Sequence, residues 1–128
     1  MKVTVILARI LLGFVFAAAG LFDLLNLGKL GGLPPDAMTF LSLLVAHHYT
    51  PFIGLIMLCG GVLLLVGRFV PIGLVLLGPI LINILLFHFM FHAPGVATGL
   101  VCTVLEIFLI WAYRSSFRGI FVAAPDIG

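Results

Sequence analysis

Three charged residues, Arg9, Asp23 and Glu106, lie inside long apolar stretches of the chain. Such residues are costly to place in a membrane and usually mark a functional or structural site. At about 1.5 Å of rise per helical residue, Arg9 and Glu106 should lie at similar depths near the same side. We therefore predict an Arg9–Glu106 pair between the first and last helices. The pair is either a structural clasp, in which each charge satisfies the other, or the setting of a Glu106 carboxyl that carries a proton or binds a ligand.

A second group of polar side chains, Asp23, Asn83 and His88, provides candidates for ligand or quinone binding. Asp23 and His88 match in depth near the outer side of the membrane and could meet. An imidazole N–H could bond a quinone carbonyl and exchange a proton with it. Asn83 lies near mid-membrane, where its amide must hydrogen-bond within the bundle and is expected to join helices. The five residues from Asn83 to His88 turn the helix by about 140°, so the spacing does not favour one pocket for both.

His88 and His92 stand four residues apart, which puts two imidazoles on one helical face and suits a metal ion. However, Ala93-Pro94 is expected to end the helix at His92, which weakens this geometry. A full site would also need Asp23 or the His47–His48 pair to converge there. We therefore expect histidines at a polar interface and no metal site, with His88 and His92 as weak candidates.

Composition sets the class of protein that must hold these residues. Of the 128 residues, 64% are hydrophobic and 8% are charged, and the mean hydropathy is +1.43. Typical soluble domains are about half apolar and about a quarter charged, so lipid must cover much of this surface. The net charge is only +2, and the basic residues form no run. Nucleic acid is therefore not an expected partner.

The apolar stretches predict an all-α fold, an integral membrane four-helix bundle in a single domain over 1–128. A spanning helix needs about 20 apolar residues, and we expect spans over about 4–27, 49–66, 69–91 and 96–113. The first is expected to be an uncleaved helix, because Arg9 interrupts it early and its pattern continues past the alanines that resemble a cleavage site. Between the first two spans, a short helix capped by Asp36 is expected to be re-entrant or interfacial. Pro79 should kink the third span.

The distribution of basic residues predicts the orientation in the membrane. With four spans, five basic residues share one side and only Lys29 lies on the other; the five are Lys2, Arg9, Arg68, Arg114 and Arg118. Because basic residues favour the cytoplasmic side, we expect a multi-pass protein of the cell (inner) membrane with both termini in the cytoplasm.

One stripe of the first span should face the other helices. Arg9, Gly13, Phe16, Gly20 and Asp23 recur at spacings of four and three, which places them on one helical face. Ala17 adds a small residue four positions after Gly13. Small residues let a neighbouring membrane helix approach closely, so this face is predicted to point into the bundle.

Several segments together resemble the DoxX family of small membrane proteins. They follow in the family's order and spacing, from about residue 8 to 121, and comprise Ala8–Gly13, Ala19-Gly20, Gly60-Gly61, Leu64–Pro71, Pro79, Asn83–His88, Leu105-Glu106, Trp111–Arg114 and Phe117-Arg118. The resemblance implies a four-helix membrane fold and links to quinone reduction or thiol-handling complexes. The matching site positions would be Arg9, Asn83, His88 and Glu106.

Two departures from the family pattern bear on function. Many relatives carry a glutamate just before the paired glycines, where this chain has Met57, and a lysine in the first helix, where this chain has Asp23. If those residues serve a redox reaction, this chain lacks it, which favours a non-catalytic role. We therefore expect an accessory subunit of a membrane redox or respiratory assembly, bound to a larger membrane or periplasmic protein.

Two alternatives remain open, and whether the chain is an enzyme is left open with them. The first is a quinone-linked oxidoreductase component, with quinone as the possible cofactor and an electron donor supplied from elsewhere. The second is a small proton-coupled transporter that uses the membrane carboxylate of Glu106. Transporters of similar size carry their glutamate in the first helix, where this chain offers Arg9 and Asp23 instead.

Overall fold

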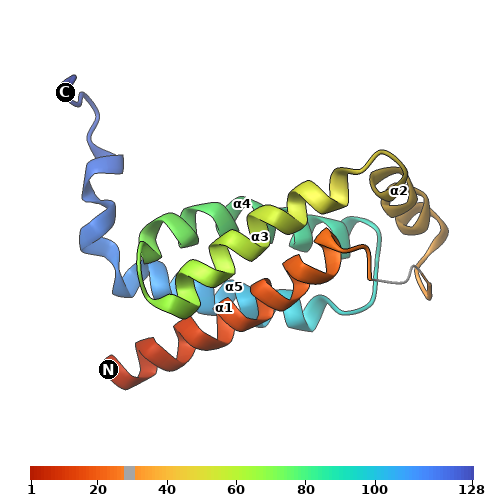
Figure 1. Ribbon diagram of the computed structural model, residues 1–128, viewed down its shortest axis with the longest axis horizontal. Helices are drawn as coiled ribbons and strands as arrows, with labels where there is room; N and C mark the ends of the chain where they lie inside the picture. The colour runs from red at the N-terminus through yellow and green to blue at the C-terminus, as the bar shows by residue number, and fades with distance from the viewer. Residues whose placement is uncertain (28–30) are drawn as a thin grey trace.

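The computed structural model describes residues 1–27 and 31–128, and within these ranges the chain is helical and has no strand. The elements follow in the order α1 (Lys2–Leu24), α2 (Pro35–Ala46), α3 (Tyr49–Val66), α4 (Val70–Met90), α5 (Val96–Ala112) and the 3₁₀ helix η1 (Arg114–Phe121) (Figure 1). The all-α expectation is confirmed for the described residues. The predicted placement of Lys29 on the outer side concerns a residue outside them.

Three helices, α1, α3 and α4, are long and apolar enough to cross a membrane. A fourth is added if α5 and η1, which are bent by 81° relative to each other, count as one span. The second predicted span agrees with α3, whereas the first ends at Leu24 rather than residue 27. Asn26 has a positive φ of 54°, a left-handed conformation that Asn tolerates better than most residues and that ends the helix.

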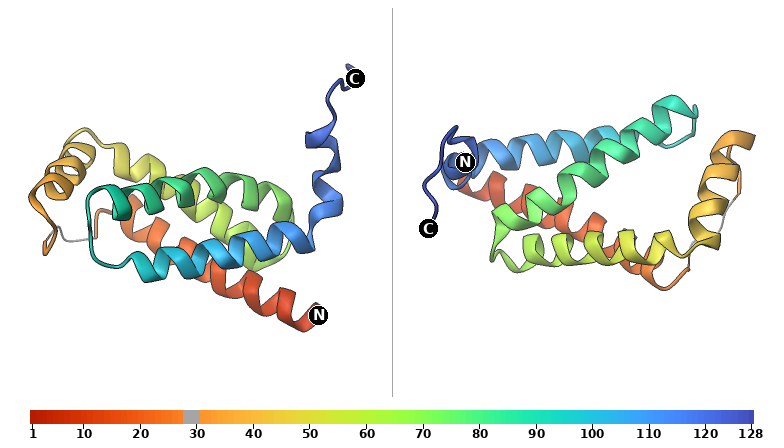
Figure 2. Two further views of the ribbon diagram at one scale, coloured as in Figure 1. Left: turned by 180° about the vertical axis from the view of Figure 1, so that it is seen from behind. Right: turned by 90° about the horizontal axis from the view of Figure 1, so that it is seen from above.

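The helices α1, α3, α4 and α5 pack in a ring. The helix α1 contacts α3 and α5, and α4 contacts both α3 and α5. Neighbouring helices run antiparallel, and both chain termini lie at the end of the ring opposite α2 (Figures 1 and 2). The fully buried side chains come from every helix of the ring and are Leu12, Leu64, Leu74, Leu77 and Leu109.

The outside of the ring is covered with large apolar side chains. In each of α1, α3 and α4, only 28% of the residues in the most apolar 18-residue stretch are buried. Side chains such as Phe14, Phe52 and Val104 are each at least 64% exposed. An apolar exterior on this scale is typical of a surface that faces lipid or another protein, so the structure is compatible with a membrane protein.

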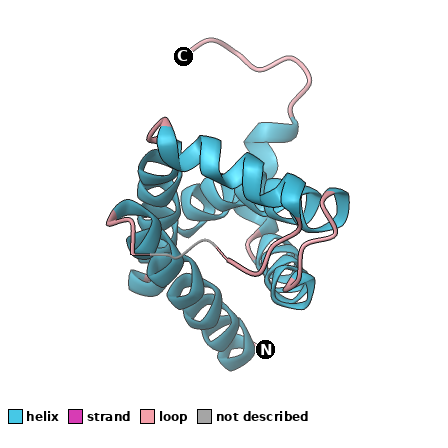
Figure 3. Cartoon of the chain, turned by 90° about the vertical axis from the view of Figure 1, so that its right-hand side faces the viewer, coloured by secondary structure: helices cyan, strands magenta, loops and turns pink. Residues whose placement is uncertain are grey.

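The short helix α2 lies across one end of the ring (Figures 1 and 3). It begins at Pro35 after an N-cap at Pro34 that makes no side-chain hydrogen bond. The prediction that Asp36 caps this helix is therefore wrong. Asp36 lies in the first turn instead, where its negative charge still suits the positive end of the helix dipole.

The closest helix contact joins α1 and α3 through glycines. A Cβ atom built on Gly13 would lie 2.8 Å from the carbonyl oxygen of Gly61, and one on Gly20 would lie 2.6 Å from that of Gly54. Real side chains do not fit at such distances, so the two backbones touch only because these positions lack a Cβ. The predicted inward face of the first helix is confirmed for Gly13, Phe16 and Gly20, which are all buried.

We predict that Gly61→Ala destabilises the protein. Its Cβ would lie 2.5 Å from the backbone nitrogen of Ala17 and 2.7 Å from the carbonyl oxygen of Gly13, so the two helices must move apart. Overpacking of this kind costs roughly 1–3 kcal/mol, more than the roughly 1 kcal/mol that alanine gains over glycine in a helix. The midpoint of thermal unfolding in detergent should therefore fall.

Gly78→Ala is the matched control for Gly61→Ala. It is also a glycine within a long helix, but the nearest atom to its new Cβ is Glu106 Oε1 at 3.8 Å, an ordinary contact distance. Its unfolding midpoint should stay unchanged or rise. Equal midpoints for the two variants would contradict the assignment of Gly61 to a backbone contact.

Candidate functional site

A groove opens between α3 and α4 at the end of the ring that α2 covers. Figure 2 shows α3 and α4 close together near the turn that joins them and separated toward α2. The groove has a volume of about 550 Å³. Its walls are mostly apolar and include Phe40 of α2, Met57 of α3, and Phe87, Met90 and Phe91 of α4. Ligand pockets of roughly 300–1,000 Å³ with mostly apolar walls are typical of proteins that bind small molecules.

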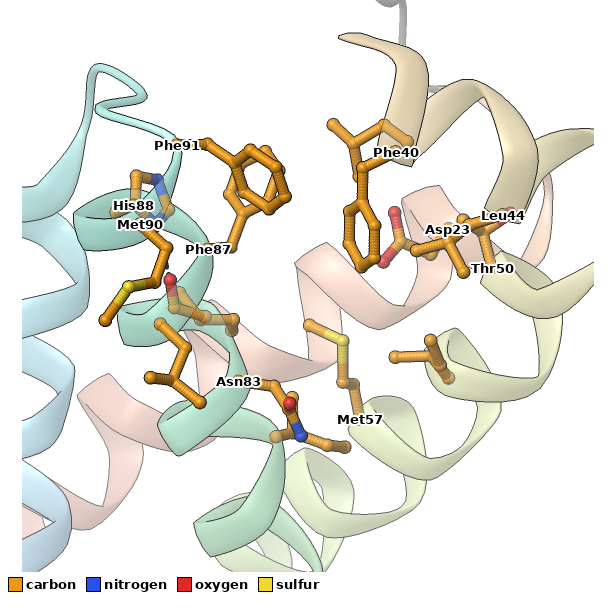
Figure 4. A pocket seen from close by; sticks show the side chains of 15 residues that line it. Asp23, Phe40, Leu44, Thr50, Met57, Asn83, Phe87, His88, Met90 and Phe91 are labelled. Carbon is orange, nitrogen blue, oxygen red and sulfur yellow. Dashed lines mark hydrogen bonds between the residues drawn. The ribbon is translucent and has the colours of Figure 1, made fainter. Parts of the chain in front are cut away.

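Aromatic rings join α2 to α4 across the groove. The ring of Phe40 stacks on that of Phe91 with a centroid distance of 5.3 Å and lies 6.0 Å from that of Phe87. Figure 4 shows Phe87 and Phe91 on one side of the groove and Phe40 on the other. These contacts hold the short helix over the opening, so a ligand that enters the groove meets aromatic faces first.

Four polar side chains also line the groove: Asp23, Thr50, Asn83 and His88. The sequence singled out three of them as ligand-binding candidates, and the structure brings these three to one groove. Thr50 was missed, although its hydroxyl is buried without a hydrogen-bond partner among the described residues. Its position one residue before Pro51 in the first turn of α3 gives no sequence signal for such a role.

The side chain of Asn83 is oriented by its own helix. Its Nδ2 donates a hydrogen bond to the carbonyl oxygen of Pro79 at 3.0 Å. The expectation that this amide joins two helices is not met, because the hydrogen bond stays within α4 and the side chain is exposed to the groove. Figure 4 places Asn83 at the base of the groove opposite Met57.

The side chain of His88 is also oriented by a carbonyl of its own helix. Its Nδ1 lies 2.7 Å from the carbonyl oxygen of Ile84. Because a carbonyl oxygen only accepts, Nδ1 carries the proton and donates it. The other ring nitrogen, Nε2, lies 3.6 Å from the position that a Cβ on Gly95 would take, so it faces the turn between α4 and α5.

The spacing of Asn83 and His88 did not favour one pocket for both, yet both residues line the groove. The groove is wide enough to reach around α4, and His88 lies at its boundary with a smaller cavity. This cavity of about 240 Å³ lies among α1, α3, α4 and α5 and is lined by Met57, His88 and Cys102, among others. A rotation of about 140° between two residues therefore does not separate them when the space beside the helix is broad.

Asp23 and His88 face the groove from opposite sides (Figure 4). Asp23 comes from the last turn of α1 and is half-buried. No hydrogen bond between the two side chains is present among the described residues. The structure thus brings them to one groove, and their direct contact stays a prediction.

The two weak metal candidates do not share a helical face. The helix α4 ends at Met90, and His92 follows it with a positive φ of 53°. Its side chain is exposed, as are those of His47 and His48. Among residues 1–27 and 31–128, no three side chains of the His, Cys, Asp or Glu types gather as a metal site requires.

The predicted Arg9–Glu106 pair is not formed in this structure. Both carboxylate oxygens of Glu106 and the Nε of Arg9 are buried without a hydrogen-bond partner among the described residues. The guanidinium of Arg9 lies against Gly67 at the C-terminal end of α3, with its Cζ 2.8 Å from the position of a Cβ there. The carboxyl of Glu106 lies beside Gly78 of α4 instead.

The direction of the side chains explains why this pair does not form. Side chains on a helix tilt toward its N-terminus, and α1 and α5 run in opposite directions (Figure 2). Arg9 therefore reaches toward the end of the ring and Glu106 away from it. Between Val70 at the start of α4 and Gly78, the helix rises about 12 Å, so the two charged groups lie at different depths.

The site and the fold together define an all-helical protein with helices able to cross a membrane and an apolar groove that carries a few polar groups. The chain is similar to the uncharacterized protein YwoB of Bacillus subtilis (strain 168), with 30% identity in an alignment that covers 91% of this chain and 81% of YwoB. The chain belongs to the same family as YwoB. No family model and no solved structure matches it, so the resemblance to the DoxX family stays a prediction.

We predict that Arg9 and Glu106 contribute independently to stability. In a double-mutant cycle of Arg9→Gln and Glu106→Gln, the changes in unfolding free energy should add to within about 0.5 kcal/mol, as they do for residues without a shared contact. Unfolding by a denaturing detergent in mixed micelles measures these changes. A coupling energy above about 1 kcal/mol would show that the two side chains pair in the membrane.

Proposed function

We propose that the chain is a multi-pass protein of the cell (inner) membrane, a four-helix bundle in which α5 is the fourth span. The apolar exterior of the ring supports this proposal, because it needs lipid around it. In the proposed orientation both termini lie in the cytoplasm. The short helix α2 then lies at the outer surface, and η1 lies along the inner surface because it is bent by 81° from α5.

Residues at the end of α5 support this orientation. The Nη1 of Arg114 donates a hydrogen bond to the carbonyl oxygen of Trp111 at 2.8 Å, and its Cζ lies 4.6 Å from the centroid of the Trp111 ring. Tryptophan is enriched at membrane interfaces, and arginine is enriched on the cytoplasmic side. The pair therefore suits the cytoplasmic headgroup region.

We propose that the groove holds a quinone-class ligand and that the protein is the quinone-linked component of a membrane redox or respiratory assembly. The single observation that carries this proposal is the groove itself, in which aromatic walls accompany the polar groups of Asn83 and His88. The rings of Phe40 and Phe91 already stack on each other, so a flat ring would lie beside the cluster of Phe40, Phe87 and Phe91. The amide of Asn83, which is exposed to the groove, lies where it could bond one of the ring's oxygens. When bound, such a ligand accepts or gives up electrons and protons, and a larger partner protein would supply or receive the electrons.

The proton-coupled transporter is supported less well by this geometry. Its candidate carboxylate, Glu106, does not line the groove and is buried beside Gly78. A ligand in the groove would not touch it. The other carboxyl group, that of Asp23, does line the groove but comes from the last turn of α1.

The proposed orientation predicts the activity of reporter fusions. Green fluorescent protein fused after Gly128 should fluoresce, because it folds in the cytoplasm. Alkaline phosphatase inserted after Pro94, in the turn between α4 and α5, should be active, because it needs the oxidising outer side. The reverse pattern at both sites would overturn the orientation.

The groove proposal predicts stoichiometric binding of a decyl-substituted benzoquinone, in one or both of its redox forms, to the protein in detergent. Asn83→Trp should weaken binding at least about tenfold, because the larger side chain fills the base of the groove. Isothermal titration calorimetry under anaerobic conditions measures both forms.

Ile82→Trp is the matched control for the groove-filling variant. Ile82 is the preceding residue on α4, is 62% exposed and does not line the groove. Its affinity should equal that of the unchanged protein. Failure of either redox form to bind the unchanged protein, or an equal loss in the two variants, would refute the groove as the quinone site.

A further inference from the structure

The core of the ring contains a carboxyl group, that of Glu106. Within residues 1–27 and 31–128, Glu106 is the only polar or charged side chain that is buried, with 4% of its surface exposed. Both of its carboxyl oxygens lack a hydrogen-bond partner among these residues. Native proteins rarely bury a polar group without a partner, so the state of this carboxyl needs a chemical explanation.

Apolar packing surrounds the carboxyl of Glu106. On the same face of α5, Cys102 lies four residues before it and Leu109 three residues after it, and both are buried. On α4, the absence of a side chain at Gly78 leaves room for the carboxyl, whose Oε1 lies 3.8 Å from the position that a Cβ would take there. An ionised carboxylate without a partner in such surroundings is so costly that the group takes up a proton instead.

The charged and titratable groups on the neighbouring elements do not compensate a negative charge on Glu106. The guanidinium of Arg9 lies against Gly67, at a different depth in the ring. None of the others makes a hydrogen bond to the carboxyl; they are Asp23 on α1, Cys59 on α3, His88 on α4, Cys102 on α5, and Tyr113 and Arg114 directly after α5. A bound proton is therefore the means by which this core removes the charge.

We propose that the core of the ring is a proton-binding site, in which Glu106 is a neutral carboxylic acid at neutral pH. At alkaline pH the carboxyl O–H bond breaks, the proton passes to hydroxide to form water, and the carboxylate keeps the electron pair. Because the carboxylate must then reach water, α4 and α5 have to separate at Gly78. The bound proton thus controls how firmly the ring closes. Glu106 does not line the groove, so this inference does not depend on the proposed quinone-class ligand.

The sequence allows this proton to be observed without assignment. Glu106 is the only glutamate of the chain, and the chain has no glutamine. Glutamate labelled with ¹³C at its carboxyl Cδ therefore reports on one group in the unchanged protein. In lipid vesicles at neutral pH, solid-state NMR should show its resonance at the shift of a neutral acid, and alkaline pH should move it to the shift of a carboxylate.

A matched control moves the only glutamate to the surface. Asp36 is exposed in the first turn of α2, so the double variant Asp36→Glu with Glu106→Gln carries the same label outside the core. Its resonance should show a carboxylate at neutral pH. The comparison separates the effect of the buried position from any effect of the vesicles or of the label.

The stability of the ring should depend on pH through Glu106. The folded protein binds one proton more than the unfolded chain, so its stability falls as pH rises. This window begins near pH ~4.3, where an exposed glutamate ionises, and ends where Glu106 ionises in the ring. Within it, the unfolding equilibrium constant in mixed micelles should rise by up to about tenfold per pH unit.

Two variants assign this pH dependence to one group. Glu106→Gln replaces the neutral acid by a neutral amide of similar shape and should remove most of the dependence. Cys102→Ala removes the titratable thiol one turn earlier on the same face of α5 and should leave the dependence in place.

Each result of these experiments decides for or against the proton site. A carboxylate signal from the unchanged protein at neutral pH would overturn it. So would a carboxylate that becomes a neutral acid in Arg9→Gln, since Arg9 would then be its partner. A pH dependence that persists in Glu106→Gln would assign the proton to another group. If the variants fail to fold, the labelled unchanged protein still decides, because its measurement needs no substitution.

Discussion

The contact between the backbones of α1 and α3 determines how the rest of the ring is arranged. In lipid, apolar side chains gain little by moving from lipid to a neighbouring helix, so close van der Waals packing of small residues holds helices together. Gly13 faces Gly61, and Gly20 faces Gly54. The two glycines of each helix are seven residues apart, which is about two turns, so the contact follows one face of each helix. It fixes the rotation and the depth of α3 relative to α1.

The neighbour of Gly61 extends this arrangement to α4. Consecutive residues of a helix point about 100° apart, so Gly60 faces a different helix from Gly61. A Cβ on Gly60 would lie 2.9 Å from the side chain of Leu77 and 3.3 Å from the carbonyl oxygen of Gly73. The paired glycines thus place α3 at a corner of the ring. Toward α2 the facing residues are larger, such as Met57, Ile80 and Phe87, and there the groove opens.

The sequence predicted the helices well because apolar length and helix-breaking residues are local properties. The bounds of α3 agree with the prediction. The helix α4 is shorter than predicted by one residue at each end, and α5 is shorter by one residue at its C-terminal end. It also predicted the inward face of α1 from its small residues. It could not identify the partners of these glycines, because Gly54 and Gly61 become informative only when the antiparallel register of α1 and α3 is known.

The candidate site was predicted in part, and its errors have a common physical origin. Helix depth was estimated from Cα positions, whereas Arg9 and Glu106 extend in opposite directions along antiparallel helices. The rotation between Asn83 and His88 along α4 did not favour one pocket for both. The width of a groove, however, depends on the distance between α4 and the neighbouring helix. Both quantities come from tertiary packing. Thr50 and the ring of Phe40 belong to the site for the same reason, since α2 and α3 bring them to α4.

The internal hydrogen bonds of Asn83 and His88 explain how a small bundle could hold a ligand selectively. Each side chain bonds the carbonyl four residues earlier in α4, that of Pro79 or of Ile84. Each therefore has one polar atom fixed by its own helix and one atom left for another partner. A group oriented before binding loses less conformational entropy when the ligand arrives. No second helix is needed to orient these groups, so α2 and α3 remain free to form the apolar walls of the groove.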